Sequence, residues 1–481
     1  MALVKGSLPM DFKLSKVIRV ILFALLAGSG IGIGVADEKK PNVLFISVDD
    51  LNDWTGALKG HPQAKTPHLD RLAESGVLFE NAHCAAPACN PSRAALMTGI
   101  RPSTSGVYTN SQPWRQSPVL KDAPTIPQWF RQSGYEVFGA GKILHGAYQD
   151  PPSWDYYWPS QKQSKPGDPR PAQLPANGIP KTSHFDWGSH PEGKEEMGDW
   201  KVAEWVSGEL HKKRENPFFL ACGFYRPHLP WFAPQEYFDR FPLDEIVLPE
   251  TLESDLDDIP EAGIKIAKPD GDHAKVIKHD QWKQAVQGYL ASIAFADDCV
   301  GKVLDALDSS GHAEDTIVVL WSDHGWHLGE KKHWRKFALW EEATRVQMMW
   351  RVPGLTQPNS RTDNPANLLD IYPTLTDLCG LPANKAAEGI SLKSVLQNPD
   401  KPINHPIVTT HGRKNHSVRN RKWRFTQYAD GTRELYDHEV DPFEHTNLAG
   451  KEEHADLMTR LAKVMPKKNA KDSVSEKKKK K

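Results

Sequence analysis

The chain alternates short apolar runs with longer stretches of mixed polarity. Residues 43–48, 218–221 and 317–321 form three such runs, with at most one polar residue in each. Runs of this length without polar alternation are typical of strands buried on both faces, as in a parallel sheet covered by helices. The three runs therefore predict the centre of a parallel sheet.

Amphipathic stretches lie between these runs. The clearest covers residues 284–307, where apolar side chains recur at helical spacing. Similar patterns predict helices over residues 69–75, 125–133 and 200–213. Because strands alternating with helices are typical of α/β proteins, we predict an α/β fold with a central, mostly parallel sheet flanked by helices.

Two regions depart from this rhythm. Residues 150–195 are rich in proline, glycine and aromatic residues and too long for a plain connection, so they are either disordered or a loop that shapes a binding site. After about residue 405, residues 418–436 read as strand, turn and strand, which predicts a small C-terminal antiparallel-sheet subdomain. The aromatic residues of the segment 150–195 either stack on sugar rings or hold this segment in place. They are Trp154, Tyr156, Tyr157, Trp158 and Trp187.

The overall charge gives no sign of a nucleic-acid-binding protein. Lys and Arg number 60 against 61 Asp and Glu, a net charge of -1. Lysines gather at the end of the chain, where residues 463–481 show no apolar periodicity. Such a run is typical of a solvated, disordered tail, with a weak attraction for polyanions as the alternative.

The N-terminus has the pattern of an export signal. Lys13, Lys16 and Arg19 precede the apolar residues 20–35, and Ala36 ends a small-residue cleavage site. An uncleaved anchor is the alternative, since residues 17–35 are just long enough to cross a bilayer. We predict a signal peptide over residues 1–36, no stable membrane insertion, and a periplasmic or secreted protein.

The five cysteines are too few for a disulfide scaffold in a chain of 481 residues. Cys222, Cys299 and Cys379 lie in apolar surroundings and are interpreted as small core residues. Cys89 differs, because it lies in the polar run Cys-Asn-Pro-Ser-Arg that ends at Arg93.

Acidic residues come at the ends of two of the apolar runs. Asp49 and Asp50 come after the first run, and Asp323 and His324 come after the third. Burying unpaired carboxylates is costly, so they are expected to bind something positive, with helix capping by Asp50 or Asp53 as the alternative. Ligands gather beyond the carboxyl ends of strands in open α/β sheets. A hard divalent cation such as calcium or magnesium suits these oxygens, while His324 keeps zinc and manganese open.

Basic and imidazole side chains occupy comparable positions. Lys142 and His145 lie in a glycine-bounded turn after an apolar segment, and His228 lies between two prolines. Lys336 belongs to a basic cluster shortly after His324. Each alone is interpreted as a surface charge or a capped loop, but their shared position at strand ends favours a functional site.

These motifs together resemble the type I sulfatases of the alkaline-phosphatase superfamily over about residues 41–450. The run from Cys89 to Arg93 resembles the signature that a formylglycine-generating enzyme converts to 3-oxoalanine. Within the family, the chain is most similar to the iduronate-2-sulfatases. The resemblance implies an alkaline-phosphatase-like fold and hydrolysis of sulfate esters by the hydrate of the aldehyde. It also implies one calcium-like ion held by Asp49, Asp50, Asp323, His324 and converted Cys89.

The resemblance assigns roles to the remaining polar residues. Arg93 would orient and stabilise the hydrate of residue 89. Lys142 and Lys336 would bind sulfate oxygens and offset developing charge. His228 would protonate the leaving alkoxide, and His145 would take a proton from the second hydroxyl of residue 89.

The same resemblance predicts the domains and partners. It implies a catalytic domain over residues 37–405, followed by the C-terminal subdomain over residues 406–462 and the lysine-rich tail. The partners are a sulfated oligo- or polysaccharide substrate and, during maturation, the formylglycine-generating enzyme. Residues 150–195 and 250–280 do not match the iduronate-2-sulfatases, and such loops choose the sugar. The basic residues expected to suit an anionic saccharide are Arg115, Arg170 and Arg335.

Two other functions fit parts of the pattern. A phosphonate or phosphate ester hydrolase of the same superfamily would use the same aldehyde and metal. A non-catalytic binder of sulfated glycans would leave Cys89 unconverted, but it would not need the set of strand-end residues described above.

Overall fold

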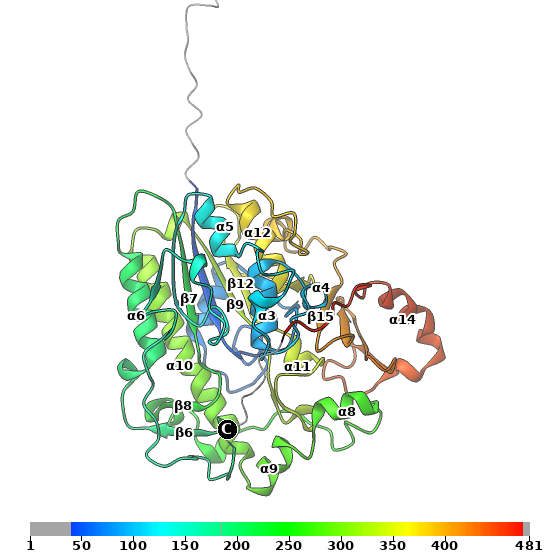
Figure 1. The fold of residues 1–481 in the computed structure, drawn as a ribbon. Coiled ribbons are helices and arrows are strands. Elements are labelled where there is room, and N and C mark those ends of the chain that lie inside the picture. Colours follow the sequence, from blue (N-terminus) through cyan, green and yellow to red (C-terminus); the bar gives the residue numbers. More distant parts are fainter. Residues whose placement is uncertain (1–39, 183, 475–481) are drawn as a thin grey trace, which may run out of the picture. The chain divides into compact units, whose positions relative to one another are not determined.

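An eight-stranded sheet lies at the centre of the computed structural model, which describes residues 40–182 and 184–474 (Figure 1). The predicted signal peptide lies outside the described residues. The sheet is mixed but mostly parallel, because only β12 runs antiparallel to its neighbours. In spatial order its strands are β13 (Ser360–Thr362), β2 (Val77–Phe79), β12 (Met348–Arg351), β9 (Thr316–Ser322), β1 (Asn42–Val48), β7 (Phe218–Phe224), β4 (Glu136–Gly141) and β5 (Tyr156–Trp158).

The register of the three central strands aligns their carboxyl ends. Val48, the last residue of β1, pairs with Phe224 of β7 and with Ser322 of β9. Gly141, the last residue of β4, pairs with Gly223. The residues that follow these strands therefore emerge side by side at one edge of the sheet.

Helices cover both faces of the sheet, as the alternation of strands and helices predicts. The side chains of β1 alternate between two cores, with Leu44 and Ile46 in one and Val43 and Phe45 in the other. Figure 1 shows α6 and α10 on one side of the strands and α3 and α12 on the other. The flanking helices are α2 (Pro67–Glu74), α6 (Gly198–Leu210) and α10 (Trp282–Ser309) with the first core, and α3 (Cys89–Thr98), α5 (Ile126–Gln132), α12 (Ile371–Leu378) and α13 (Lys393–Gln397) with the second.

The predicted helices agree with α2, α5, α6 and α10 to within a few residues at each end. The start of α5 is fixed by a capping box in which the Thr125 hydroxyl accepts the backbone N–H of Gln128 and the Gln128 side chain accepts the backbone N–H of Thr125. Among the described residues, no helix is long and apolar enough to cross a membrane.

The aromatic residues of residues 150–195 mostly hold this segment in place. Trp154, Tyr157 and Trp187 are buried in the two cores. Trp158 stacks on Trp205 with ring centroids 6.1 Å apart. Of the two interpretations of these side chains, the structure therefore favours anchoring, with half-exposed Tyr156 as the exception. The segment also contributes β6 (Trp187–His190), which pairs in parallel with β8 (Trp231–Pro234).

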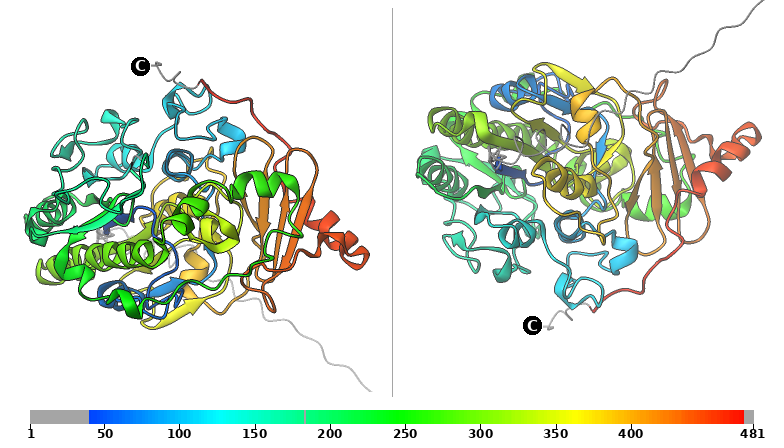
Figure 2. Two further views of the ribbon diagram at one scale, coloured as in Figure 1. Left: turned by 90° about the horizontal axis from the view of Figure 1, so that it is seen from below. Right: turned by 90° about the horizontal axis from the view of Figure 1, so that it is seen from above.

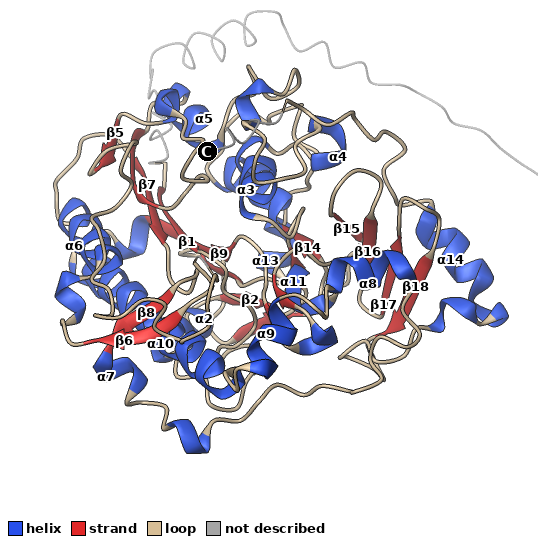
Figure 3. Ribbon diagram, turned by 60° about the horizontal axis from the view of Figure 1, so that its bottom comes forward, coloured by secondary structure: helices blue, strands red, loops and turns tan. Residues whose placement is uncertain are grey.

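The C-terminal residues form the predicted antiparallel sheet. It consists of β15 (Ile407–Thr410), β16 (His416–Arg419), β17 (Trp423–Gln427) and β18 (Arg433–Asp437), with α14 (Ala455–Ala462) packed on its outer face (Figures 2 and 3). The chain then returns to the larger sheet domain, where the backbone N–H groups of Ala470 and Ser473 donate to Ser103 and Gly106 at 2.8 Å each. Residues 463–474 are thus bound to the protein, in contrast to the expected disordered tail, and residues 475–481 lie outside the described residues.

Shorter elements complete the described chain. Three two-stranded pairs stand beside the larger sheets. Besides β6 and β8, they are β3 (Ala82–His83) with β14 (Ala366–Asn367), and β10 (His327–Leu328) with β11 (Trp334–Arg335). The remaining α-helices are α4 (Pro102–Ser105), α7 (Gln235–Phe238), α8 (Glu261–Ala267), α9 (Asp272–Lys278) and α11 (Glu341–Thr344).

A buried ionic cluster joins the C-terminal sheet to the rest of the protein. Arg424 of β17 is fully buried and pairs with Glu341 at the start of α11 and with Glu444 at 2.5 Å. The Arg424 guanidinium also donates to the backbone carbonyl of Leu339 at 3.1 Å. Because Leu339 and Glu341 follow the segment that carries Lys336, the C-terminal sheet supports that segment.

Replacing Arg424 with Gln is expected to lower the free energy of unfolding by about 3 kcal/mol, because Glu341 and Glu444 then stay buried with fewer positive partners. Urea unfolding followed by tryptophan fluorescence measures this change. The control Arg71→Gln removes a pair with Asp305 whose side chains are 44% and 61% exposed, and should change the value by less than about 0.5 kcal/mol. Equal effects of the two substitutions would show that the buried cluster does not stabilise the fold.

Acid unfolding gives a second measure of the same cluster. Burial opposes ionisation of Glu341 and Glu444, but neighbouring arginines and His438 outweigh it and hold both pKa values below the ordinary 4.5. Their stabilisation is therefore present above about pH 4.5 and is lost as the pH falls through the lower folded-state values. Arg424→Gln should accordingly unfold at a higher pH than the unchanged protein during acid titration.

Candidate active site

Two pairs of polar residues emerge together from the central strands. Asp49 and Asp50 follow β1, Asp323 and His324 follow β9, and all four side chains are fully buried. Asp50 has a φ of 60°, in the left-handed region that non-glycine residues rarely adopt. Its backbone N–H donates to Asp323 Oδ1 at 3.1 Å, and its carbonyl accepts the Tyr289 hydroxyl at 2.8 Å. These bonds hold the turn that presents both carboxylates to one point.

Cys89 is the first residue of α3 and lies against these four residues. Its Sγ is 3.3 Å from His324 Nε2, 2.9 Å from Lys336 Nζ and 4.0 Å from Lys142 Nζ. Every residue of α3 is buried, including the polar ones. The sequence run after Cys89 therefore has to find its hydrogen-bond partners inside the protein.

Each polar residue after Cys89 has such a partner. The Asn90 side-chain amide donates to the carbonyls of Thr109 and Gln112 at 2.9 and 2.8 Å. The Ser92 hydroxyl donates to the Asp323 carbonyl at 2.6 Å. The Ser92 bond fixes the start of α3 against the end of β9, and the Asn90 bonds fix it against the loop of Thr109 and Gln112. The fold therefore sets the position of residue 89 relative to Asp323.

The Arg93 guanidinium ties the strand ends together. Its Nε donates to Asp323 Oδ2 and its Nη2 to Asp49 Oδ1, both at 2.9 Å. Its Nη1 donates to the Ser47 hydroxyl at 2.9 Å and to the Lys142 carbonyl at 2.7 Å. Burial opposes the charge, but Asp323 and Asp49 outweigh it and raise the pKa of Arg93. Arg93 is therefore a buried, permanently charged link between β1, β9 and the turn after β4.

Two buried lysines supply the other positive charges. Lys142 Nζ contacts Asp49 Oδ2, and Lys336 Nζ lies 2.7 Å from Asp50 Oδ1. Burial disfavours both ammonium groups, but these carboxylates outweigh it and raise both pKa values. The lysines are charged at neutral pH, and both approach Cys89 Sγ.

Asp49, Asp50, Asp323 and His324 form an acidic cluster beside Cys89. This acidic cluster has the donor atoms of a site for a divalent cation. Ligand atoms of Asp50, Cys89, Asp323 and His324 all lie within 4.8 Å of one another. Those of Asp49, Asp50, Cys89 and His228 do so as well. Asp50 Oδ2 is buried and accepts no hydrogen bond from any residue that the structure describes. Burial raises the pKa of Asp50 to about 7 against the opposing charge of Lys336, and a bound cation would favour its ionised form.

Two histidines lie beside this cluster. His228 Nε2 is 3.9 Å from Asp50 Oδ2, and its Nδ1 is 2.5 Å from the Leu229 carbonyl. Burial, followed by the charge of Lys142, holds the pKa of His228 well below its ordinary value. Burial and the two lysines lower the pKa of half-buried His145 to about 3. Both rings are neutral at neutral pH, and His145 Nδ1 has no hydrogen-bond partner among the described residues.

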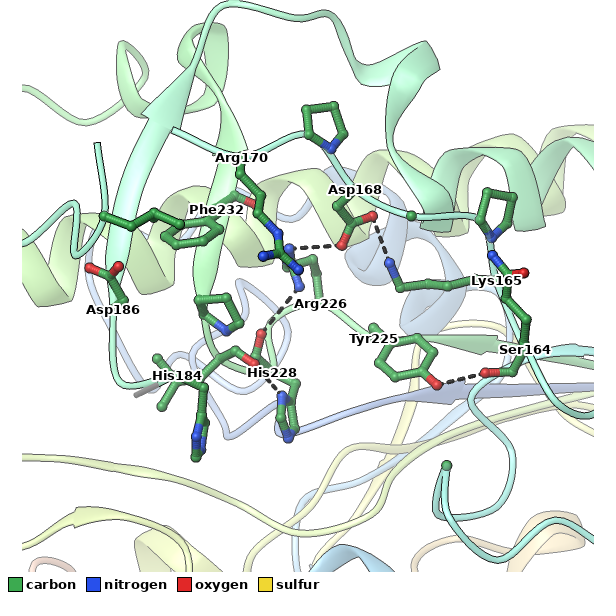
Figure 4. Close-up of a pocket in the computed structure, with 18 of the residues that line it drawn as sticks. Ser164, Lys165, Asp168, Arg170, His184, Asp186, Tyr225, Arg226, His228 and Phe232 are labelled. Atoms are coloured by element: carbon green, nitrogen blue, oxygen red, sulfur yellow. Dashed lines mark hydrogen bonds and ion pairs between the residues drawn. The ribbon is translucent and has the colours of Figure 1, made fainter. Parts of the chain in front are cut away.

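The turn that carries His228 is held by a largely buried ion pair. Arg226 Nη2 donates to Asp168 Oδ2 at 3.0 Å, and Arg226 Nε donates to the Phe232 carbonyl at 3.0 Å (Figure 4). Asp168 also pairs with Lys165 at 2.6 Å, and the two charges outweigh its burial and lower its pKa to about 2. Asp168 therefore fastens residues 162–170 to the His228 turn.

A cavity of about 880 Å³ opens beside His228. Residues from the segments 162–175, 181–186 and 225–232 line it, including His228 itself (Figure 4). The segment 150–195 is thus a loop that shapes a cavity next to the site, which is one of the two possibilities that its composition left open.

The other nine predicted site residues therefore gather around Cys89. The three arginines expected to bind a saccharide differ from one another. Arg115 is engaged by Asp150 at 2.9 Å and by the carbonyls of Leu120 and Ala123, so it supports the loop instead. Arg335 pairs with Asp272 at 2.7 Å. Arg170 is exposed and lines the cavity.

Sequence reasoning missed several residues that position the site. Tyr289 belongs to the apolar stripe of α10, and nothing in that pattern separates it from a core residue. Ser47 lies inside an apolar strand. Asp168 lies in a proline-rich loop, 58 positions before its partner Arg226. Of these residues, only Ser47 has a local signal in the sequence, because it is the one polar residue within an apolar run.

Comparison with known proteins agrees with this geometry. A profile described as sulfatase matches residues 41–381, and one described as the C-terminal part of N-sulphoglucosamine sulphohydrolase matches residues 329–471. A sulfatase from Formosa agariphila is 40% identical over 90% of this chain and 87% of its own. The iduronate 2-sulfatase of Mus musculus is 32% identical over 76% of this chain and 74% of its own.

The fold is shared with a solved phosphonate monoester hydrolase from Silicibacter pomeroyi, at a TM-score of 0.73 and 21% identity over 88% of this chain and 94% of that one. At this identity the likeness concerns the fold alone. The sulfatase profile, in contrast, covers most of the chain, including residues 89–93 and the carboxylates around them. This chain therefore belongs to the sulfatase family and is a sulfuric ester hydrolase.

Proposed function

We propose that this protein is an exported sulfatase that removes a sulfate ester from a sulfated saccharide, in the manner of the iduronate-2-sulfatases. It would use one calcium ion and a formylglycine that is made from Cys89. The observation that carries the proposal is the position of residue 89, at the start of a buried helix, between two charged lysines and the acidic cluster. Export rests on the N-terminal sequence pattern, which lies outside the described residues.

Residue 89 is poorly placed to act as a thiol. Burial raises the pKa of the Cys89 thiol to about 12 despite the nearby lysines. Because the thiolate is the nucleophilic form of cysteine, little of it exists at neutral pH. Conversion to the aldehyde and addition of water would supply two geminal hydroxyls at the same position, which suit the resident lysines and a hard metal ion.

The ion would be held by Asp49, Asp50, Asp323, His324 and the oxygen of residue 89. When bound, a divalent ion supplies positive charge that favours an ionised hydroxyl and polarises sulfate oxygens. Hard oxygen ligands favour calcium, and His324 is the one untypical member of the set.

The protein's own groups would do the rest of the chemistry. Lys142 and Lys336 both approach residue 89 and would bind the sulfate oxygens. Their charges would stabilise the negative charge of the transition state. His228 lies between the acidic cluster and the cavity, so it would donate a proton to the leaving oxygen of a saccharide in the cavity. The negative charge of the bound sulfate ester favours the protonated form of this ring.

His145 would complete the cycle. Its ring is neutral and its Nδ1 is unpartnered among the described residues, so it can accept a proton. In the proposal, one hydroxyl of residue 89 attacks sulfur as the sugar oxygen departs, which leaves a sulfate ester on residue 89. His145 then takes the proton of the second hydroxyl, the bond between the residue 89 carbon and the sulfate oxygen breaks, sulfate leaves, and the aldehyde returns and is hydrated again by water. Arg93 would keep residue 89 and the carboxylates in register throughout, because it contacts both Asp49 and Asp323.

Substitution of Cys89 by Ser tests the aldehyde. In protein co-produced with a formylglycine-generating enzyme, Cys89→Ser should release sulfate from sulfated saccharides at least about 10³-fold more slowly, because serine lacks the second hydroxyl. The buried cysteine of α10 gives the matched control Cys299→Ala, which should keep its rate. Mass spectrometry of the peptide that contains residue 89 reports the conversion.

The substrate panel separates this proposal from its alternatives. It contains a 2-sulfated iduronate disaccharide, other sulfated sugars and an aryl phosphodiester. A higher turnover of the phosphodiester than of every sulfate ester would assign the protein to the phosphonate or phosphate ester hydrolases. Binding of sulfated glycans without turnover, despite a confirmed aldehyde, would assign it as a binder.

Removal of divalent ions tests the acidic cluster. Exhaustive chelation should abolish sulfate release, and calcium should restore it better than magnesium, zinc or manganese, because most of the ligands are hard oxygen atoms. The melting temperature should also fall on chelation, since the ion binds the folded state. Full activity in the chelated protein would contradict a metal-dependent reaction.

Asp168→Asn tests how His228 is positioned. The turnover number for a sulfated saccharide should fall by about tenfold, while that for 4-nitrophenyl sulfate stays the same, because only a poor leaving group needs a proton from His228. Asp150→Asn, which removes the partner of Arg115 in the same loop, is the control and should leave the ratio of the two rates unchanged. Equal losses on both substrates would mean that Asp168 supports the fold without positioning His228.

A further inference from the structure

The position of the cavity beside His228 indicates which part of the substrate it would hold. His228 lines the cavity and also lies 3.9 Å from Asp50 of the acidic cluster. Given the proposed role of His228 as proton donor to the leaving oxygen, the cavity lies on the side of the leaving group. This inference therefore rests on the proposed function. It concerns the saccharide that remains after sulfate has been removed.

The volume of the cavity indicates what it can hold. At about 880 Å³ it is far larger than a sulfate group and lies within the range of about 300–1,000 Å³ that is typical of small-molecule sites. Its wall includes Leu174 and the aromatic rings of Tyr225 and Phe232, which can lie against the faces of sugar rings. Figure 4 shows the two aromatic rings. The cavity thus has room for at least one sugar unit.

The charges of the wall are strongly one-sided. Two of its cations, Lys165 and Arg226, are paired with Asp168. The second carboxylate of the wall, Asp186, accepts the backbone N–H groups of Ala176 and Asn177 at 2.9 and 2.8 Å. Both acidic side chains are therefore already occupied by groups of the protein.

Three further cations of the wall are not occupied in this way. Lys162, Arg170 and Lys181 are exposed, and within the described residues none of them forms an ion pair. The chain as a whole has almost equal numbers of cations and anions, so this excess is local. Figure 4 shows the Arg170 side chain directed into the cavity. A guanidinium in this position can bind a carboxylate or a sulfate through two parallel hydrogen bonds.

We propose that this cavity is a subsite for a second anionic group of the substrate. Arg170 and Lys181, supported by Lys162, would bind a carboxylate or a further sulfate on the saccharide that leaves with the oxygen of the cleaved ester. The preferred substrate is therefore a saccharide with at least two anionic groups, and Lys162, Arg170 and Lys181 determine this preference.

Kinetics with matched substrates test the subsite. Three saccharides share one cleavable sulfate ester and differ in the remaining group, which is neutral, a carboxylate or a second sulfate. Arg170→Gln and Lys181→Gln should each raise KM for the dianionic substrates by about tenfold, which corresponds to about 1.4 kcal/mol. Their kcat should stay unchanged, as should both constants for the neutral saccharide and for 4-nitrophenyl sulfate.

The controls are exposed cations outside the cavity. Lys213→Gln and Arg433→Gln should leave all constants unchanged. The second anion whose KM responds most to Arg170→Gln identifies the group that the subsite binds. Equal effects of Arg170→Gln on neutral and dianionic saccharides, or no effect on either, would overturn the proposal.

Failure of the proposed function is a distinct outcome. If the protein releases sulfate from no ester, the sulfatase proposal fails, but titration calorimetry with the disulfated saccharide still tests the subsite. Binding that is weakened by Arg170→Gln and unaffected by Lys213→Gln supports the subsite. Binding that is the same for both variants contradicts it.

Discussion

The active site depends on one buried guanidinium. Arg93 has no exposed surface, yet it bonds to two carboxylates, one hydroxyl and two backbone carbonyls from the ends of three strands. Without a cation at this point, Asp49 and Asp323 would repel each other in a medium of low dielectric constant. Charge pairing by Arg93 allows the parallel sheet to bring these carboxylates to one place and to hold them there without solvent.

The regions around this centre contribute through a few long-range ties. The C-terminal sheet reaches the segment of Lys336 through Arg424, and the loop of residues 150–195 reaches the turn of His228 through Asp168. Both ties are ion pairs with little or no exposure, and each ends on a segment that carries a residue near Cys89. The groups above the sheet edge are thus positioned by parts of the chain that lie far away in sequence.

Local sequence patterns predicted the sheet and the residues at its edge because both leave local signals. An apolar run that ends in two carboxylates marks Asp49 and Asp50 without reference to the rest of the chain. Contacts between distant segments leave no such signal, so the partners of Arg93 and the pairing of Asp168 with Arg226 were not predicted. Arg115 shows the reverse error. Its charge indicated a residue that binds the saccharide, but its guanidinium already donates hydrogen bonds to Asp150 and to two backbone carbonyls. The lysines near the C-terminus indicated disorder, but backbone hydrogen bonds, which composition does not report, fix residues 470 and 473.

The burial of α3 has a consequence for the biosynthesis of the enzyme. Cys89 is 1% exposed, and the residues after it are bonded to the interior, so no second protein can reach this thiol once the helix has docked. If Cys89 is converted as proposed, the conversion would have to compete in time with folding. Each molecule would then enter one of two permanent populations, aldehyde or thiol, according to which event came first. The specific activity of a preparation would record the relative speeds of these two events in the producing cell, and later addition of a converting enzyme to folded protein would not change it.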